Sequence, residues 1–215
     1  MGTVSNSSIT PVPSEIGFTG FALTEFVPGR LRERHDSISR SVPSRLPTNV
    51  SQPTARDYFD IAHGTFIWRA IPAYTRDVVK RTVKHPKGYL RDSGLLHALL
   101  RLPDSDALLV HPQMGGSWEG MVVEEILRQL SAVGVAHQCS YYRTSAGAEV
   151  DLVVEGGFGR VAVEIKHTST VGGRDLRSLR DFVRDQKARL GLVINNDVAP
   201  RQYDDDLIGL PFTWL

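Results

Sequence analysis

Two segments near the middle of the chain alternate between apolar and polar residues, as half-buried β-strands do. They cover residues 147–154 and 161–166, and a glycine-rich stretch, residues 155–160, joins them. Glycine suits the backbone of a tight reversal, so this pattern predicts a β-hairpin. The alternation assigns six aliphatic residues to a face that packs on a core and five residues to the opposite face. The core-facing residues are Val150, Leu152, Val154, Val161, Val163 and Ile165, and the opposite face carries Glu149, Asp151, Ala162, Glu164 and Lys166.

The opposite face of this hairpin carries an unusual concentration of acid. A symmetric register about the turn places Asp151 across from Glu164, and Glu149 across from Lys166. Directly opposed side chains have Cβ atoms roughly 4.5–5.5 Å apart, where like charges repel. A hard cation such as Mg²⁺ would turn that repulsion into attraction. The alternative is an exposed charged face with a Glu149–Lys166 salt bridge, and the hairpin alone does not decide between the two.

A further carboxylate, Glu119, lies on a predicted helix that Ser117 caps and that runs from Trp118 to about Val133. Steps of 100° per residue give this helix an apolar stripe with Glu119 in its middle. The stripe consists of Val122, Ile126, Leu130 and Val133, with Val123 and Leu127 at its margin and Glu124, Glu125, Arg128 and Gln129 on the other side. A buried carboxylate is costly without compensation. Glu119 therefore either caps backbone N–H groups or points at a cation, and the acidic hairpin favours the cation.

The remaining elements of the C-terminal half follow from similar patterns. We expect a strand over residues 136–143, a helix over residues 174–189 and an apolar central strand over residues 191–195. The helix carries a basic stripe that could follow phosphates, although a solvated helix face has the same pattern. This stripe consists of Arg177, Arg180, Arg184 and Lys187. The acidic triplet of residues 204–206 is expected to be a solvated turn.

The N-terminal half predicts two further units. Frequent prolines in residues 1–50 indicate a poorly structured segment. Residues 51–103 predict a small winged-helix-like module: a helix from Ala55 to about His63, a strand within residues 65–71, and a short helix over residues 93–100. Its basic loop, with Lys80, Arg81, Lys84 and Lys87, would meet a DNA backbone as a wing does. A basic turn that keeps a sheet edge soluble is the other interpretation.

Composition limits the possible functions without selecting one. The chain of 215 residues is 41% hydrophobic and 23% charged with a formal net charge of +1, so nucleic-acid binding would depend on local patches. The single Cys139 excludes an intramolecular disulfide and a cysteine-based zinc site. No apolar run approaches the ~20 residues of a membrane span and no leader peptide opens the chain, so we expect a cytoplasmic protein with no membrane partner. No GxxxxGK[ST] loop is present, so the chain is not expected to be an ATPase by itself.

Four blocks of residues, in order along the chain, resemble a known family. They are Lys80-Arg81 with Lys84-His85-Pro86-Lys87-Gly88-Tyr89-Leu90-Arg91-Asp92-Ser93-Gly94-Leu95-Leu96, then Gly116-Ser117-Trp118-Glu119, then Tyr142-Arg143-Thr144 with Glu149-Val150-Asp151, and last Val163-Glu164-Ile165-Lys166. At this spacing they are similar to the domain of unknown function 4143, found at the C-terminus of many prokaryotic AAA-type ATPases. From residue 117 onward the predicted order is helix, three strands, helix, strand. With its carboxylates and Glu-x-Lys, this order resembles the PD-(D/E)XK nuclease superfamily over residues 115–196.

The resemblance implies an α/β fold for residues 104–215, with a restriction-endonuclease-like core of a mixed sheet flanked by helices. It implies a metal-dependent nuclease acting on DNA phosphodiester bonds with Mg²⁺ or Mn²⁺. Glu119, Asp151 and Glu164 would hold the metal, and Lys166 would stabilise the attacking water or the developing charge. The alternative is a non-catalytic module that binds DNA or protein and retains the nuclease-like fold.

The resemblance also implies a partner. The ATPase module that precedes this domain in the family is not found in the sequence. We therefore expect either a separate ATPase subunit or a truncated relative of a longer ATPase.

Overall fold

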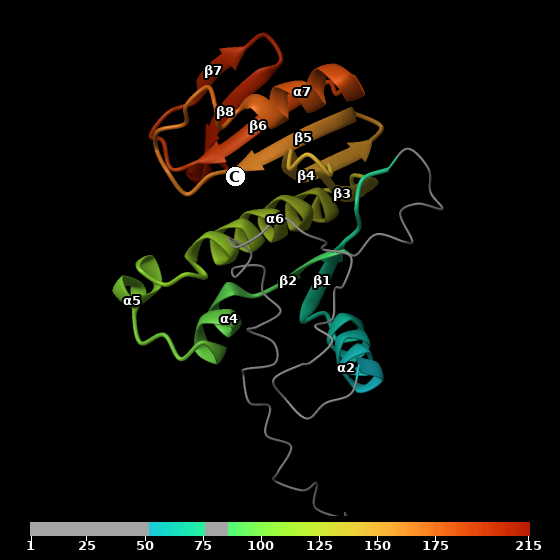
Figure 1. Ribbon diagram of the computed structural model, residues 1–215, viewed down its shortest axis with the longest axis vertical. Coiled ribbons are helices and arrows are strands. Elements are labelled where there is room, and N and C mark those ends of the chain that lie inside the picture. Colours follow the sequence, from blue (N-terminus) through green and yellow to red (C-terminus); the bar gives the residue numbers. More distant parts are fainter. Residues whose placement is uncertain (1–51, 76–85) are drawn as a thin grey trace, which may run out of the picture.

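The computed structural model describes residues 52–75 and 86–215 (Figure 1). The predictions for residues 1–50 and for Lys80, Arg81 and Lys84 lie outside the described residues. No helix in the described ranges is long and apolar enough to cross a membrane.

The C-terminal half is built on a mixed six-stranded sheet. Its strands, in spatial order, are β3 (His137–Arg143), β4 (Glu149–Gly156), β5 (Gly159–Ile165), β6 (Leu190–Asn195), β8 (Leu207–Pro211) and β7 (Arg201–Asp204). The strands β3, β4 and β5 form an antiparallel meander, β6 runs parallel to both β5 and β8, and β7 is antiparallel to β8. The predicted hairpin, the mixed α/β class and the predicted order of elements are confirmed. The β7–β8 hairpin was not predicted, because we interpreted the acidic triplet of residues 204–206 only as a solvated turn.

One helix covers each face of this sheet (Figure 1). The long helix α6 (Met114–Ala132) packs on one face, where Val122, Val123 and Leu127 join a core with Leu152 and Val163. The helix α7 (Arg177–Gln186) packs on the other face, where its apolar residues Leu179, Phe182 and Val183 are buried. The sheet is therefore buried on both sides, and most of its central strand residues are apolar.

The predicted faces of the hairpin are only partly correct. Leu152 lies in the core beneath α6, but Val150 lies in the core beneath α7. The cause is a β-bulge: Ser140 pairs with Val153 and Tyr142 with Val150, so β4 uses two residues where β3 uses one. Asp151 is one of these two residues. A bulge reverses the alternation beyond it, which is why the simple period-2 prediction fails at this point.

The helix α6 also differs from its prediction. It begins at Met114, so Ser117 is a buried residue of its first turn and not its cap. Val133, predicted to be in the apolar stripe, is 72% exposed, whereas Glu124, predicted to face solvent, is buried. The contact surface is therefore rotated relative to the predicted stripe.

The preceding part of the chain lies on the side of α6 that faces away from the sheet (Figure 1). It consists of α2 (Gln52–Gly64), the antiparallel pair β1 (Trp68–Ile71) and β2 (Lys87–Leu90), α4 (Ser93–Leu99) and α5 (Ser105–Leu109). No helix was predicted where α5 lies. Ile71 and Tyr89 from the two strands belong to the same core as α6, which joins this part to the sheet. The chain closes with a short 3₁₀ helix, η1 (Phe212–Trp214).

Candidate functional site

The ammonium group of Lys87 lies among three carboxylates from two other elements. Lys87 begins β2, and its Nζ forms ion pairs with Glu119 of α6, with Glu149 at 3.0 Å and with Asp151 at 3.4 Å. The side chain of Lys87 is only 12% exposed. We call Lys87, Glu119, Glu149 and Asp151 the Lys87 cluster. Burial lowers the pKa of Lys87, but the negative groups around it outweigh burial and raise the pKa overall, so the lysine is charged.

Glu119 has a second partner, Tyr89, which lies beside this cluster. The hydroxyl of Tyr89 donates a 2.6 Å hydrogen bond to Oε1 of Glu119. Burial and the neighbouring charge of Asp151 raise the pKa of Glu119 to about 6, although Lys87 and Tyr89 act in the opposite direction. Lys87 and Tyr89 are two residues apart on β2 and so share a face, and both reach α6 because the β1–β2 pair packs directly against this helix.

Glu164 forms a separate pair with Lys166, at 2.7 Å. The side chain of Glu164 is 8% exposed, and its Oε2 is buried without a hydrogen-bond partner. Burial and the charge of Asp151 raise the pKa of Glu164 to about 8, and Lys166 opposes this rise. Asp151 thus acts electrostatically on both groups, and it links the Glu164–Lys166 pair to the Lys87 cluster.

Asp151 is held by the hairpin itself. Its Oδ2 accepts a 2.9 Å hydrogen bond from the backbone N–H of Ile165, and its Oδ1 faces Lys87. The bulge at this residue explains how one side chain reaches both the adjacent strand and β2. The pairing of β4 with β5 ends at Leu152 and Val163, one residue short of Asp151 and Glu164, so the opposition of these two acids stays a prediction.

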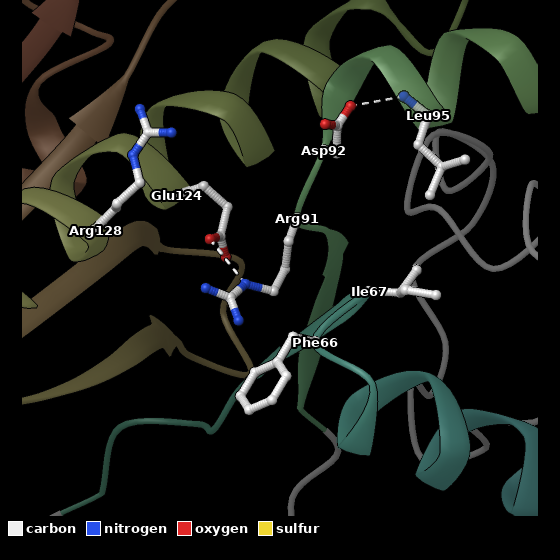
Figure 2. A pocket seen from close by; sticks show the side chains of 7 residues that line it. All are labelled: Phe66, Ile67, Arg91, Asp92, Leu95, Glu124 and Arg128. Atoms are coloured by element: carbon white, nitrogen blue, oxygen red, sulfur yellow. Dashed lines mark hydrogen bonds and ion pairs between the residues drawn. The ribbon is translucent and has the colours of Figure 1, made fainter.

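A buried ion-pair network holds β1 and β2 against α6. Glu124 accepts hydrogen bonds from Arg69 of β1 and from Arg91, which follows β2. Figure 2 shows the Arg91–Glu124 pair at the wall of a hollow of about 370 Å³. The hollow is lined by Phe66, Ile67, Arg91, Asp92, Leu95, Glu124 and Arg128. None of these residues belongs to the Lys87 cluster. The network instead fixes the strand that carries Lys87 beside the helix that carries Glu119.

The basic stripe of α7 is partly neutralised. Arg180 pairs with Asp204 at 2.5 Å, and Arg184 pairs with Asp181 and Asp185. Arg177 and Lys187 are exposed at the two ends of the helix. Two of the four residues are thus engaged within the chain.

The sequence did not indicate the position of Lys87 or the participation of Tyr89. Lys87 was assigned to a basic loop that contacts DNA, but its side chain turns inward to the carboxylates. The available signal was the spacing of Lys87 and Tyr89, which places both on one face of a strand. Glu149 was expected opposite Lys166, whereas the structure pairs it with Lys87 and, at 3.8 Å, with Arg143.

The arrangement gathers three carboxylates around the ammonium group of a lysine. Carboxylates are the ligands that Mg²⁺ and Mn²⁺ prefer. In the described ranges, however, no group of three or more His, Cys, Asp or Glu side chains stands ready to hold a metal ion. Three of the acids converge on the ammonium group of Lys87, while the fourth, Glu164, has a buried oxygen without a partner.

The fold and this site define a mixed α/β domain with a buried acidic cluster at a sheet–helix junction. Residues 114–214 match the family model described as "Domain of unknown function (DUF4143)", which supports the assignment of this part of the chain to the DUF4143 family. Residues 31–106 match a second model, described as "Domain of unknown function (DUF8612)".

Two curated relatives are similar over most of the chain. They are the "Uncharacterized protein Mb2031c" of Mycobacterium bovis and the "Uncharacterized protein Rv2008c" of Mycobacterium tuberculosis. Each is 40% identical over 164 residues, which is 76% of this chain and 36% of the relative. The chain therefore spans about a third of the length of these relatives. No solved structure matches.

Proposed function

We propose that the sheet domain is a metal-dependent nuclease of the PD-(D/E)XK type that hydrolyses DNA phosphodiester bonds. The observation that carries the proposal is the buried, unpartnered Oε2 of Glu164 next to Lys166 and in the field of Asp151. A buried carboxylate oxygen without a partner is costly, and a cation ligand is one explanation for its retention. The order of elements and the Glu-x-Lys on β5 also support this class.

The residues present fit a hard divalent cation by donor type. Glu164, Asp151 and Glu119 supply carboxylate oxygens, and formal charge in this region favours a cation, because four acids face Lys87, Lys166 and Arg143. Bound Mg²⁺ or Mn²⁺ would supply Lewis acidity and an activated water. Lys166 would hold its ammonium group toward the developing negative charge on the phosphate. Asp151 is fixed by its hydrogen bond from the Ile165 N–H, so its carboxylate would keep its position as a metal ligand.

The proposal extends to the rest of the chain. The module of residues 51–103 would act as a winged-helix-like DNA contact, and the exposed Arg177 and Lys187 would add backbone contacts. The resemblance to C-terminal domains of AAA-type ATPases suggests a cytoplasmic, ATPase-linked system. The curated relatives are long enough to contain such a further module.

A second candidate is a non-catalytic module that binds DNA or a protein. The observation that favours it is Lys87, which already neutralises the acids that a metal would use. In that case the cluster would serve the fold alone.

One experiment separates the two candidates. Purified protein is incubated with plasmid and with single-stranded DNA, in Mg²⁺, Mn²⁺ or EDTA. We expect cleavage that requires the metal and that Glu164→Gln and Lys166→Met abolish. Glu155→Gln is the matched control, because Glu155 lies on the same hairpin and pairs with Arg160 near the turn. Metal-independent cleavage, or cleavage that survives Glu164→Gln, would exclude this site as the catalytic centre. DNA binding without cleavage would favour the second candidate.

A further inference from the structure

The position of Lys87 has a consequence for how the cluster takes up a cation. Its Nζ contacts Glu119 and Asp151, which are two of the three carboxylates proposed to hold the metal. It also contacts Glu149, which is outside the proposed metal set. A lysine ammonium group and a divalent cation cannot both occupy the space between the same two carboxylates.

We propose that Lys87 is a built-in counter-ion that competes with the divalent cation, so that metal binds only when the ammonium group leaves Glu119 and Asp151. The inference rests on the proposed function, since it concerns regulation of the same site. The partner of the acids in this state of the protein is a side chain of the chain itself.

The surroundings of Lys87 support a displaceable cation and not a passive surface charge. The side chain is largely buried, so its charge is poorly screened by solvent. Its neighbours fix the carboxylates independently of it: Tyr89 holds Glu119, and the Ile165 N–H holds Asp151. The acids would therefore keep their positions after Lys87 moved. Lysine also has a flexible four-carbon stem, which allows the ammonium group to swing out of the cluster while β2 stays in place.

The other lysine of the site provides the contrast. Lys166 pairs with Glu164 through Oε1, but it leaves Oε2 of the same carboxylate without a partner. Glu164 thus keeps one oxygen for a cation while Lys166 remains bound. Lys87 leaves no such oxygen on Asp151, because it faces Oδ1 while the Ile165 N–H donates to Oδ2.

The test is Mn²⁺ binding to the full chain, measured by isothermal titration calorimetry for the parent and for Lys87→Met, which retains length and removes charge. We expect Lys87→Met to bind Mn²⁺ at least about tenfold more tightly than the parent. Arg160→Met is the matched control, because it removes the same charge near the turn of the hairpin, outside the site, and it should not tighten binding. A Lys87→Met variant that binds Mn²⁺ equally or more weakly than a metal-binding parent would overturn the inference and leave the proposed function standing. Absence of binding in both proteins would overturn both.

A second variant covers the case in which Lys87→Met does not fold without metal. Lys87→Met/Glu149→Gln removes one positive and one negative charge, and Glu149 is the most exposed of the three carboxylates, at 32%. Its thermal midpoint should rise more on addition of Mn²⁺ than the midpoint of the parent does. An equal or smaller rise would overturn the inference.

Discussion

The carboxylate of Asp151 accepts a 2.9 Å hydrogen bond from the backbone N–H of Ile165, on the neighbouring strand. This contact closes the end of the β4–β5 hairpin at the bulge, where the regular ladder is interrupted. The same carboxylate faces Lys87 at 3.4 Å. Asp151 therefore has a structural task and an electrostatic task, and two substitutions separate them.

Asp151→Asn should leave the free energy of unfolding nearly unchanged in EDTA, because the amide oxygen can still accept the Ile165 N–H. Asp151→Ala should lower it by about 1–3 kcal/mol, because that N–H loses its partner. Both variants should lose the Mn²⁺-induced rise in thermal midpoint. Urea denaturation measures the first effect and thermal melts measure the second. Equal stability of the two variants would mean that the hydrogen bond contributes little, and a persistent Mn²⁺ effect in both would remove Asp151 from the metal set.

A second prediction concerns pH. Burial and the charge of Asp151 raise the pKa of Glu164 from its ordinary value of 4.5 to about 8 in the folded protein, despite Lys166 and Lys87 nearby. The folded state therefore binds a proton more tightly than the unfolded state does. The stability linked to this group is fully present below about pH 4.5 and is lost as pH rises through about 8. Glu119 adds a smaller effect of the same sign, with a pKa of about 6.

Urea denaturation in EDTA at several pH values tests this linkage. We expect the free energy of unfolding to fall between about pH 5 and pH 8, and Glu164→Gln to remove most of the fall. At pH 8 the variant should be more stable than the parent, because a neutral amide replaces a buried charge. Glu155→Gln, near the turn of the same hairpin, should follow the parent. A parent whose stability rises over this range would contradict the assigned direction.

The order of helices and strands could be predicted from the sequence, but the exact composition of the site could not. Periodicity identified α6, the hairpin and β6, because each buries a regular apolar pattern. It failed at Asp151, since nothing in the local pattern reveals an inserted residue. It also failed at Glu124, whose burial depends on Arg69 and Arg91 from another part of the chain.

The role of Lys87 was missed for a related reason. Its neighbours along the sequence are basic, so it was grouped with them as a solvent-facing residue. Its actual partners lie 32 to 64 residues away, on α6 and β4. Such pairings are determined by how β2 packs on α6, and short-range sequence patterns carry no information about that packing. Glu119 was easier to place, because the pattern of its own helix puts it within the apolar stripe, and its side chain is only 20% exposed.

A third prediction concerns nucleic-acid contacts of α7. Arg177 and Lys187 are exposed, whereas Arg180 and Arg184 are paired with acids. Arg177→Ala/Lys187→Ala should weaken DNA binding and reduce the slope of log K against log salt by up to about two. Arg180→Ala/Arg184→Ala removes the same formal charge and should weaken binding less. Fluorescence anisotropy at several salt concentrations measures both. Equal losses would indicate a general charge effect, and binding that ignores salt would argue against a backbone contact.

The last prediction concerns the close approach of α6 and β2 at Gly120. A Cβ added at Gly120 would lie 2.9 Å from Cδ1 of Tyr89, so Gly120→Ala must displace that ring. We expect a loss of about 1–3 kcal/mol in the free energy of unfolding from this overpacking. Gly115 provides the matched control on the same helix, since a Cβ there has nothing within 4 Å. Gly115→Ala should raise the free energy of unfolding by up to about 1 kcal/mol, because alanine favours the helix.

The two glycine variants also test the link from packing to the site. Tyr89 donates its hydroxyl to Glu119, so a displaced ring should release this carboxylate from its fixed position. Metal-dependent DNA cleavage should therefore fall in Gly120→Ala and be retained in Gly115→Ala. Urea denaturation and the plasmid assay give the two readouts. If Gly120→Ala is destabilised and cleaves as well as the parent does, the position of Glu119 does not depend on Tyr89. The proposed metal set would then have to function without that hydrogen bond.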